Sequence, residues 1–137
     1  MNTKKKGDIG LGKAIAYYTS LGNTICIPLT DSQDYDLVVD DGEFLKRIQV
    51  KRCTYKRNGI SEVSLTVKGG NRSSTGKIKK FDAEQVEIIV ISTADDLYII
   101  PTNEIGNKQS MKLGKKYDCF KVWNYALAAE TVDRTIL

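Results

Sequence analysis

Residues 35–53 carry two neighbouring strand-like segments, and these segments limit the folds that the chain can adopt. The first runs over residues 35–40 and is closed by Asp41-Gly42, a dipeptide that is common in tight turns. The second runs over residues 44–53, where apolar and polar residues alternate. Two consecutive strands of a sheet are therefore expected here.

Helical periodicity occurs near both ends of the chain. Apolar side chains recur every three or four residues over 7–21, and Gly22 ends the pattern. The predicted apolar face comprises Leu11, Ala14, Ile15, Tyr18 and Leu21. The same spacing predicts a second helix over residues 118–129. Residues 82–85 have the composition of a capping box, which predicts one short helical turn.

Strand signals occupy most of the remaining chain. Further strands are predicted at residues 24–29, 86–92 and 97–101, and the last two are expected to pair as a hairpin. The strand that begins at residue 44 continues to residue 57, and Asn58-Gly59 then reverses the chain into residues 60–67 as a long hairpin arm. Helices and strands in this order predict a single α/β domain over residues 1–137, a sandwich with a mixed sheet.

Positive charge is concentrated in one segment. Residues 51–80 contain nine Lys or Arg residues and one acid, Glu62, so this segment carries +8 while the rest of the chain carries −4. Within it, residues 68–80 have no apolar periodicity and are expected to stay mobile until a partner binds. Such a segment is typical of contacts with the phosphates of nucleic acid, and a solvated charged face is the alternative.

The absence of histidine excludes several kinds of catalytic site. Ser-His-Asp triads and Cys-His proteases need an imidazole, so a general base here has to be a carboxylate, a lysine or a metal-bound water. The three cysteines form no CxxC pair and are expected to be reduced core residues rather than zinc ligands. Gly76-Lys77 is not followed by Ser or Thr, so no nucleotide cofactor is expected. No apolar run suits a membrane span, and a cytoplasmic protein is expected.

Three polar side chains interrupt the two strands, which otherwise have the composition of a core. Asp36 lies at the start of the first strand, and Gln49 and Lys51 share one face of the second. Burying such groups costs on the order of several kcal/mol each unless they are paired. One interpretation is therefore a buried ion pair with a supporting amide.

A hard metal ion is the alternative. Mg²⁺ prefers oxygen ligands, which Asp36 offers as a carboxylate, Gln49 as a side-chain carbonyl and Val50 as a main-chain carbonyl. Lys51 would then face a scissile phosphate, where it would orient the attacking water and offset charge in the transition state. Both interpretations are compatible with the residues alone.

Longer stretches of the sequence resemble a known family. They are KGDIG at residues 6–10, IPLTDSQDYDLVVDDG at 27–42, RIQVK at 47–51, LYIIPTNEI at 97–105 and YDCFKVWNYAL at 117–127. Together they resemble the PD-(D/E)XK homing endonucleases encoded in cyanobacterial group I introns, such as the intron of an initiator-tRNA gene. The resemblance covers nearly the whole chain, and the spacing of YDLVV and RIQVK is specific.

This resemblance implies a restriction-endonuclease-like PD-(D/E)XK core of αβββαβ order, with a mixed sheet flanked by helices and a basic hairpin arm. It also implies hydrolysis of both strands of a long, pseudo-palindromic DNA site with Mg²⁺, for which Mn²⁺ or Ca²⁺ can substitute in binding. Asp36 matches the first aspartate of the motif and Lys51 its lysine. Gln49 stands where most PD-(D/E)XK enzymes carry Asp or Glu and this family carries Gln.

One position departs from the family pattern. A glutamate usually follows GxxG on the first helix, and Leu11 stands there instead, on the face expected to pack on the sheet and point at the metal site. Because leucine cannot bind a cation, either Asp8 replaces the glutamate or this chain is impaired in cleavage. Impairment is the favoured hypothesis, since Asp8 also suits the start of the helix.

The expected partner is double-stranded DNA, bound by a self-associated protein. A palindromic target favours two-fold symmetry, so a dimer or tetramer is predicted. The hairpin and loop at about residues 53–80 are expected to enter the grooves. Their predicted contact residues are Tyr55, Lys56, Arg57, Lys68, Arg72, Ser73, Lys77, Lys79 and Lys80.

Three other functions compete with site-specific cleavage. A structure-selective nuclease of the same fold would cut DNA junctions, and a non-catalytic DNA-binding module would keep the fold without the metal. An RNA-binding domain fits the basic segment but leaves Asp36, Gln49 and Lys51 unexplained.

Overall fold

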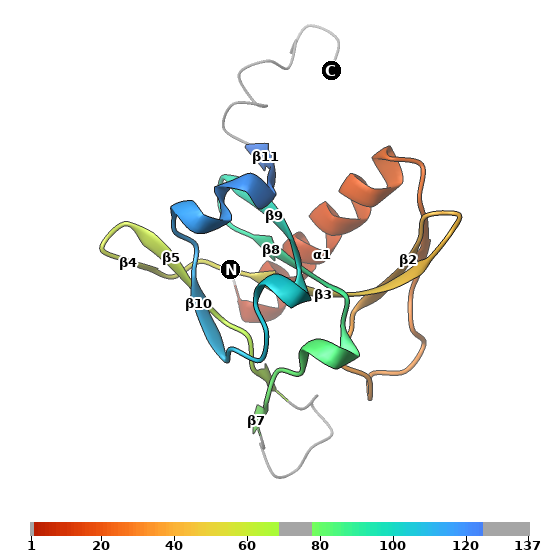
Figure 1. Ribbon diagram of the computed structural model, residues 1–137, viewed down its shortest axis with the longest axis horizontal. Helices are drawn as coiled ribbons and strands as arrows, with labels where there is room; N and C mark the ends of the chain where they lie inside the picture. The colour runs from red at the N-terminus through yellow and green to blue at the C-terminus, as the bar shows by residue number, and fades with distance from the viewer. Residues whose placement is uncertain (1, 69–77, 125–137) are drawn as a thin grey trace, which may run out of the picture.

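The structure is a computed structural model that describes residues 2–68 and 78–124 (Figure 1). Its centre is a six-stranded sheet in the order β1-β2-β3-β8-β9-β11. These strands are β1 Thr24–Cys26, β2 Leu37–Asp40, β3 Leu45–Arg52, β8 Ile88–Ser92, β9 Asp96–Pro101 and β11 Lys121–Asn124. Within this sheet β3 and β8 are parallel and the other neighbours are antiparallel, which confirms the predicted α/β fold with a mixed sheet.

Helix α1, Thr3–Ser20, packs across one face of this sheet, and smaller elements lie on the other side (Figure 1). A three-stranded sheet has the order β10-β5-β4, and β6 pairs with β7 in a two-stranded ribbon. These strands are β4 Lys56–Arg57, β5 Ile60–Ser64, β6 Val67–Lys68, β7 Ile78–Lys79 and β10 Ser110–Lys112. The 3-10 helices are η1 Ala83–Gln85, η2 Thr102–Glu104 and η3 Lys115–Phe120.

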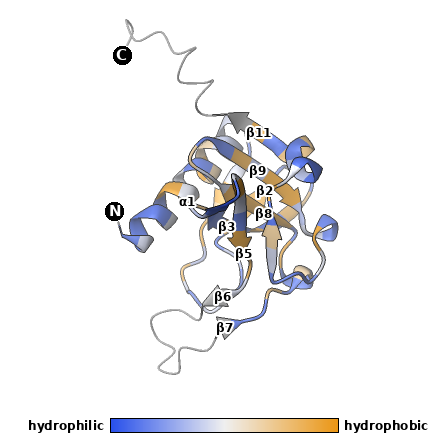
Figure 2. Ribbon diagram, turned by 90° about the vertical axis from the view of Figure 1, so that its left-hand side faces the viewer, coloured by the Kyte–Doolittle hydropathy of each residue, from blue (hydrophilic) through white to orange (hydrophobic). Residues whose placement is uncertain are grey.

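The large sheet separates two hydrophobic clusters, because successive residues of a strand point to opposite faces. The cluster on the α1 side contains Ala14, Tyr18, Leu37, Val39, Ile48, Val90 and Leu97. The opposite cluster contains Cys53, Val63, Leu65, Phe81, Ile89, Ile91, Tyr98, Ile100, Ile105, Met111, Leu113 and Tyr117. Each fully buried aliphatic side chain contributes about 1.5–3 kcal/mol, so both faces of the central strands stabilise the fold. Figure 2 shows the hydrophobic stretches on β8 and β9.

The first predicted helix is confirmed and begins at Thr3 rather than at residue 7. Asn2 caps it by accepting a hydrogen bond from the Lys5 N–H at 2.9 Å. Leu21 is 59% exposed, so its assignment to the apolar face was wrong. The helix ends at Ser20 with Leu21 as its C-cap, and Gly22, with a φ of +84°, then turns the chain away from the helix axis. No helix in the described residues is long and apolar enough to cross a membrane.

The turn at Asn58-Gly59 is confirmed, but the long arm is not continuous. Asn58 and Gly59 have φ values of +52° and +79°, as in a two-residue type I′ turn, and β4 pairs with β5 across them. The β3 strand ends at Arg52, where the chain leaves the large sheet. The buried Cys53 still donates its N–H to the Ser92 carbonyl of β8 at 2.8 Å, and β4 and β5 then continue in the small sheet.

The second α-helix predicted over residues 118–129 was wrong for the described part of that range. The chain forms η3 up to Phe120 and then β11 along the edge of β9, and residues 125–129 lie outside the described residues. A 3-10 helix also aligns residues three apart, and the rings of Tyr117 and Phe120 lie 6.4 Å from each other. Pairing with β9 satisfies the backbone groups of an otherwise open edge, so tertiary context overrode the helical periodicity.

Two smaller predictions had different outcomes. The short helical turn is confirmed as η1, where the Asp82 side chain accepts a hydrogen bond from the Glu84 N–H at 2.9 Å. All three cysteines are free, but only Cys53 among them is buried. The expectation of core positions was therefore wrong for Cys26, which lies on the edge strand β1, and for Cys119, which lies in η3; both are exposed.

Candidate active site

Asp36 lies where β3 loses one of its neighbouring strands. Pairing between β2 and β3 ends at Leu37↔Ile48, and the Asp36 N–H still donates to the Ile48 carbonyl at 2.8 Å. Beyond that point, the Asp36 carboxylate Oδ2 accepts a hydrogen bond from the Val50 N–H at 2.7 Å. A side chain thus takes the place of the missing strand and holds a carboxylate against the open edge of β3.

The main-chain carbonyl of Val50 faces the same open edge. The N–H and C=O groups of one strand residue point towards the same neighbour, and the Val50 N–H points to Asp36. The pairing of β2 ends before Val50. The carbonyl oxygen that the sequence suggested as a metal ligand therefore lies on the side of β3 that the Asp36 carboxylate occupies.

Gln49 is buried, with 4% of its surface exposed, and only half of its amide is satisfied. Its Nε2 donates to the Asp34 carbonyl at 3.1 Å, which sets the orientation of the amide because only the nitrogen can donate. Its Oε1 is buried and has no hydrogen-bond partner among the described residues. Such an orphaned acceptor costs about 1–3 kcal/mol, so a cation or a donor from outside the chain would stabilise the site.

Lys51 is half-buried, and its amine is held by a carbonyl rather than by a carboxylate. The Nζ atom donates to the Thr66 carbonyl at 2.8 Å. The ion pairs of the described residues do not include one between Lys51 and Asp36. The interpretation of these residues as a buried ion pair with a supporting amide is therefore wrong.

Asp36 and Lys51 shift each other's pKa without forming an ion pair. Desolvation raises the pKa of Asp36, and the Val50 N–H and the nearby Lys51 partly oppose this effect. Desolvation also lowers the pKa of Lys51, which Asp36 partly opposes. The Asp36 residue as a whole is exposed. Its pKa is nevertheless raised, because protein atoms packed around the carboxyl group desolvate it. A cation beside Asp36 and a phosphate beside Lys51 would stabilise both charged forms.

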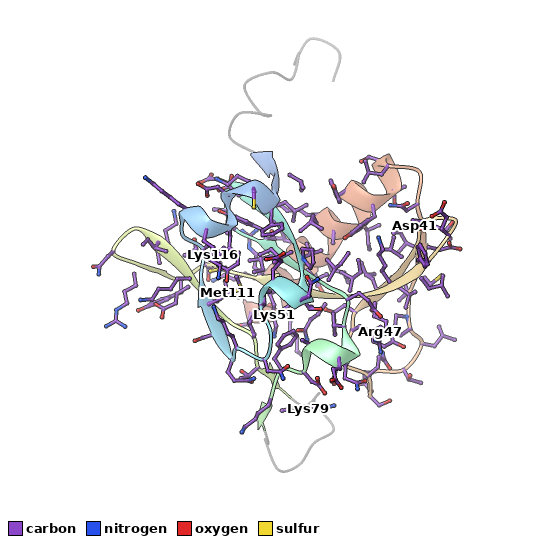
Figure 3. The ribbon with its side chains drawn as sticks, in the orientation of Figure 1. Asp41, Arg47, Lys51, Lys79, Met111 and Lys116 are labelled. Atoms are coloured by element: carbon purple, nitrogen blue, oxygen red, sulfur yellow. The ribbon has the colours of Figure 1, made fainter. Side chains whose placement is uncertain are left out.

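Surface hollows flank both residues. Lys51, near the centre of the fold in Figure 3, lines one hollow of about 390 Å³ and another of about 250 Å³. Thr3, Arg52 and Thr54 line both of these hollows as well. Asp36 lines a third hollow of about 190 Å³. A substrate can therefore approach the candidate site from the molecular surface.

The donor set of the site suits a hard cation. The described residues contain no group of three or more His, Cys, Asp or Glu side chains placed to hold a metal ion. The candidate ligands are instead one carboxylate from Asp36, the orphaned amide oxygen of Gln49 and the peptide oxygen of Val50. Mg²⁺ accepts such oxygen ligands, often with only one or two carboxylates, and retains water in the remaining positions.

The two helix positions singled out in the sequence lie on α1. Leu11 is partly buried and packs against the cluster on the α1 side, as expected. A Cβ atom on the preceding Gly10 would lie 3.5 Å from Val50 Cγ1, so this turn of the helix sits directly over the site strand. Asp8 is exposed in the second turn, and Asn2 is the cap, so the helix-start role suggested for Asp8 was wrong.

The predicted DNA-contact residues divide by what the structure describes. Those with exposed side chains are Tyr55, Lys56, Arg57, Lys79 and Lys80. Those whose side chains lie outside the described residues are Lys68, Arg72, Ser73 and Lys77. Most of residues 68–80, for which mobility was predicted, also lie outside the described residues. Lys79 does not point freely to solvent, because its Nζ forms an ion pair with Asp34 Oδ1 at 2.6 Å.

Two residues of the site were missed in the sequence. Asp34 provides the carbonyl that orients Gln49, and Thr66 provides the carbonyl that holds Lys51. Both act through the main chain, which leaves no side-chain signal in a sequence. The only available hint was that Asp34 precedes Asp36 by two residues, the spacing of one strand face.

Comparison with known proteins places these observations in a family. The model of the PD-(D/E)XK endonuclease family matches residues 1–118. Protein 5.3 of Escherichia phage T7 is 32% identical over 104 residues, which cover 74% of this chain and 83% of that protein.

Two solved structures share the fold. The bacterial homing endonuclease I-Ssp6803I matches with a TM-score of 0.70 and 22% identity, over 95% of this chain and 93% of its own. Hjc, a Holliday junction resolvase from Archaeoglobus fulgidus, matches with a TM-score of 0.55 and 12% identity, over 94% and 99%. At these identities the matches show a common nuclease-type fold, which confirms the fold class.

Proposed function

The chain belongs to the PD-(D/E)XK endonuclease family, and from this premise we propose that it cuts both strands of DNA at one specific site with the help of Mg²⁺. The observation that carries the proposal is Gln49 Oε1, an acceptor buried without a partner in the described part of the chain. It comes from the strand whose open edge holds the Asp36 carboxylate. A carboxylate and a buried amide oxygen without a partner are the kind of oxygen ligands that Mg²⁺ takes in metal-dependent hydrolysis of a phosphodiester.

Each residue then has a distinct role. Asp36, Gln49 and the Val50 carbonyl would hold the ion, and the Val50 N–H keeps the Asp36 carboxylate in place beforehand. When bound, Mg²⁺ stabilises negative charge on the phosphate and lowers the pKa of a coordinated water. Hydrolysis forms a P–O bond to water and breaks one to the deoxyribose.

Lys51 would donate to a non-bridging phosphate oxygen as charge develops there. Its hydrogen bond to Thr66 aims the amine before the substrate arrives, which reduces the entropic cost of positioning. Its lowered pKa also makes the amine a better proton donor than a solvated lysine.

Site-specific homing is the first choice for the biological substrate. The TM-score with the homing endonuclease is higher than that with the junction resolvase. The stretches around YDLVV and RIQVK resemble homing enzymes of group I introns, so we extend the proposal to an intron-insertion site as the target. Resolution of DNA junctions is the second candidate, because the resolvase fold also matches most of the chain.

A paired target calls for more than one copy of the chain. Exposed large apolar side chains lie beyond both ends of β1 and at the turn between β2 and β3, and we take them as a surface for self-association. They are Leu21, Ile27, Leu29, Phe44 and Leu45. Leu29 is fully exposed, as expected of a side chain that a second subunit covers. We propose a dimer or tetramer in which the exposed β4–β5 hairpins contact the DNA grooves.

Leu11 bears on the activity of this particular chain. It lies one residue after Gly10, which sits over Val50, so a carboxylate at position 11 would come from the helix side towards the open edge. The site as it stands offers only the Asp36 carboxylate, and a second one would add charge to the ligand set. We propose that Leu11 impairs cleavage and leaves DNA binding intact.

The test is cleavage of a supercoiled plasmid that carries an intron-insertion site, compared with a synthetic four-way junction, in Mg²⁺. The wild-type chain and Leu11→Glu are assayed together, with Leu11→Gln as a control of similar size and no charge. We expect Leu11→Glu to cut the plasmid at one position and Leu11→Gln to behave as the wild type.

Each contrary result has a defined meaning. Cleavage of the junction alone would replace homing with junction resolution. A third result is that the wild-type chain and Leu11→Glu both bind DNA and fail to cleave it in any divalent cation. That result would make the chain a binding module and overturn the catalytic roles of Asp36, Gln49 and Lys51.

A further inference from the structure

The β6–β7 ribbon is attached to the candidate active site through both of its strands. On the β6 side, the Thr66 carbonyl accepts from Lys51 Nζ at 2.8 Å, and Thr66 directly precedes the strand. On the β7 side, Lys79 Nζ pairs with Asp34 Oδ1 at 2.6 Å. The two strands pair with each other, with Val67 opposite Lys79. Figure 3 shows Lys79 at the base of this ribbon, below Lys51.

Asp34 joins the ribbon to the metal-binding side of the site. Its carboxylate holds Lys79, while its main-chain carbonyl accepts from Gln49 Nε2 at 3.1 Å. That hydrogen bond determines which way the Gln49 amide points, and so where the orphaned Oε1 lies. One residue therefore connects the position of the ribbon with the orientation of a candidate metal ligand.

Burial makes this connection stronger than an ordinary surface ion pair. The Asp34 side chain is 10% exposed, whereas that of Lys79 is 58% exposed. A carboxylate that is mostly buried needs a counter-charge, and without its partner the carboxylate has to be hydrated instead. When Lys79 is removed, we expect the segment before β2 to shift so that water reaches Asp34, which would move the Asp34 carbonyl away from Gln49.

We propose that Asp34 and Lys79 are positioning residues, through which docking of the β6–β7 ribbon sets the metal-binding geometry at Gln49. The inference rests on the proposed function, because it assumes that Gln49 binds the ion. It also gives Lys79 a role beyond the DNA contact predicted for it. An ammonium group has three donors, so Lys79 can hold Asp34 and contact a phosphate at the same time. Binding of DNA along the ribbon would then reinforce the metal site.

The test is calorimetric titration of Mn²⁺ into this chain and four variants: Lys79→Ala, Lys80→Ala, Asp34→Asn and the double variant Asp34→Asn/Lys79→Ala. Lys80 is exposed and adjacent, so Lys80→Ala removes the same charge without breaking the pair. We expect Lys79→Ala to weaken Mn²⁺ binding by about 10-fold or more, as outer-shell partners of metal sites do. Lys80→Ala should stay within about twofold of the wild type, since no hydrogen bond or ion pair of the described residues joins Lys80 to Asp34 or Gln49.

The double variant separates positioning from general electrostatics. A neutral Asn at position 34 has no charge to hydrate, so it should restore much of the affinity lost in Lys79→Ala. In a double-mutant cycle the two changes should be strongly non-additive. A simple loss of positive charge predicts the reverse, namely tighter Mn²⁺ binding in Lys79→Ala, and that result would overturn the inference.

Failure of the inference and failure of the proposed function give different results. If the wild-type chain and its Leu11→Glu variant bind no Mn²⁺, the metal-dependent function is wrong. If the wild type binds Mn²⁺ and Lys79→Ala matches Lys80→Ala, only the inference is wrong. Circular dichroism checks that each variant folds, and Lys79→Gln takes the place of Lys79→Ala if the latter does not.

Discussion

Strand β3 changes partners at Ile48, and each half uses a carboxylate to complete its unpaired edge. In the first half, the Arg47 N–H donates to Glu87 Oε2 at 2.7 Å; in the second, the Val50 N–H donates to Asp36 Oδ2 at 2.7 Å. The Arg47 guanidinium also pairs with Glu87 at 2.9 Å, whereas no ion pair within the described residues involves Asp36. The same local solution therefore gives a neutralised carboxylate in one half and an available one in the other.

The pKa values follow this difference. The hydrogen bond from Arg47 lowers the pKa of Glu87, whereas desolvation raises that of Asp36. An anion with its own counter-charge has nothing to gain from a metal ion. A desolvated carboxylate without an ion pair does gain from one. Position in the sheet alone therefore does not mark a functional carboxylate, whereas the charge around the carboxylate does.

The largest expected effect is on stability, at the residue where the two halves meet. Ile48 is fully buried in the cluster on the α1 side. Ile48→Ala should lower the free energy of unfolding by about 2–5 kcal/mol, through lost burial and a residual cavity. Chemical denaturation measures it, with Val122→Ala, at an exposed position in the same sheet, as the control. A loss below about 1 kcal/mol would mean that the centre of β3 is not packed as described.

The next largest effect is a loss of catalysis, expected only for substitutions in the second half of β3. Lys51→Met should reduce single-turnover cleavage by about 10²–10³-fold, as the loss of one donor to a transition-state oxygen does. The measurement uses whichever of wild type and Leu11→Glu cleaves faster. Lys46→Met is the control, because Lys46 belongs to the first half and pairs with Asp41 at the turn. Equal effects of the two substitutions would remove the distinction between the halves.

Replacing Asp36 or Glu87 by its amide should show that only the second half of β3 takes part in metal binding. Asp36→Asn should weaken Mn²⁺ binding by at least about 10-fold, which is the loss that even an outer-shell partner causes. Glu87→Gln should leave it unchanged, because Arg47 already neutralises Glu87. Calorimetry on both variants gives the answer, and an effect of Glu87→Gln as large as that of Asp36→Asn would contradict the assignment.

The smallest effect is in the pH dependence of stability, where the two carboxylates should have opposite signs. The lowered pKa of Glu87 means that its stabilisation is present above its ordinary value of 4.5 and is lost as the pH falls through the lowered value. The raised pKa of Asp36 means that its ionisation opposes folding as the pH rises above its ordinary value of 3.8.

Thermal unfolding between pH 3 and pH 7 tests these signs. Glu87→Gln should lower stability at neutral pH by less than about 1 kcal/mol, because the pair is partly exposed and water screens it. Asp36→Asn should flatten the remaining decrease of stability with rising pH. A steeper decrease in Asp36→Asn would mean that Asp36 is stabilised by its surroundings rather than desolvated.

Much of the fold was accessible from local patterns. Helix α1, the turn at Asn58-Gly59, the short turn η1 and the β8–β9 hairpin were all predicted, because each depends on residues close together in the chain. The failures lie where distant segments compete. Residues 121–124 have helical spacing but join the edge of β9, and the segment after Arg52 leaves the large sheet.

For the site, the sequence by itself determined which chemical groups are present. Asp36, Gln49 and Lys51 interrupt strands of core composition, and alternation places Gln49 and Lys51 on one face, because the side-chain period of a strand is two. The absence of histidine likewise restricted the chemistry to carboxylates, a lysine and a bound cation.

Only the tertiary structure decided how those groups are used. It limits the pairing of β2 with β3 to Leu37 and the residues after it, so that the edge at Val50 is open. It also brings the carbonyls of Asp34 and Thr66 to Gln49 and Lys51. These contacts join residues about fifteen positions apart through main-chain atoms that every residue carries. No side-chain pattern can encode them, because they arise from strand pairing and burial, which depend on the whole fold.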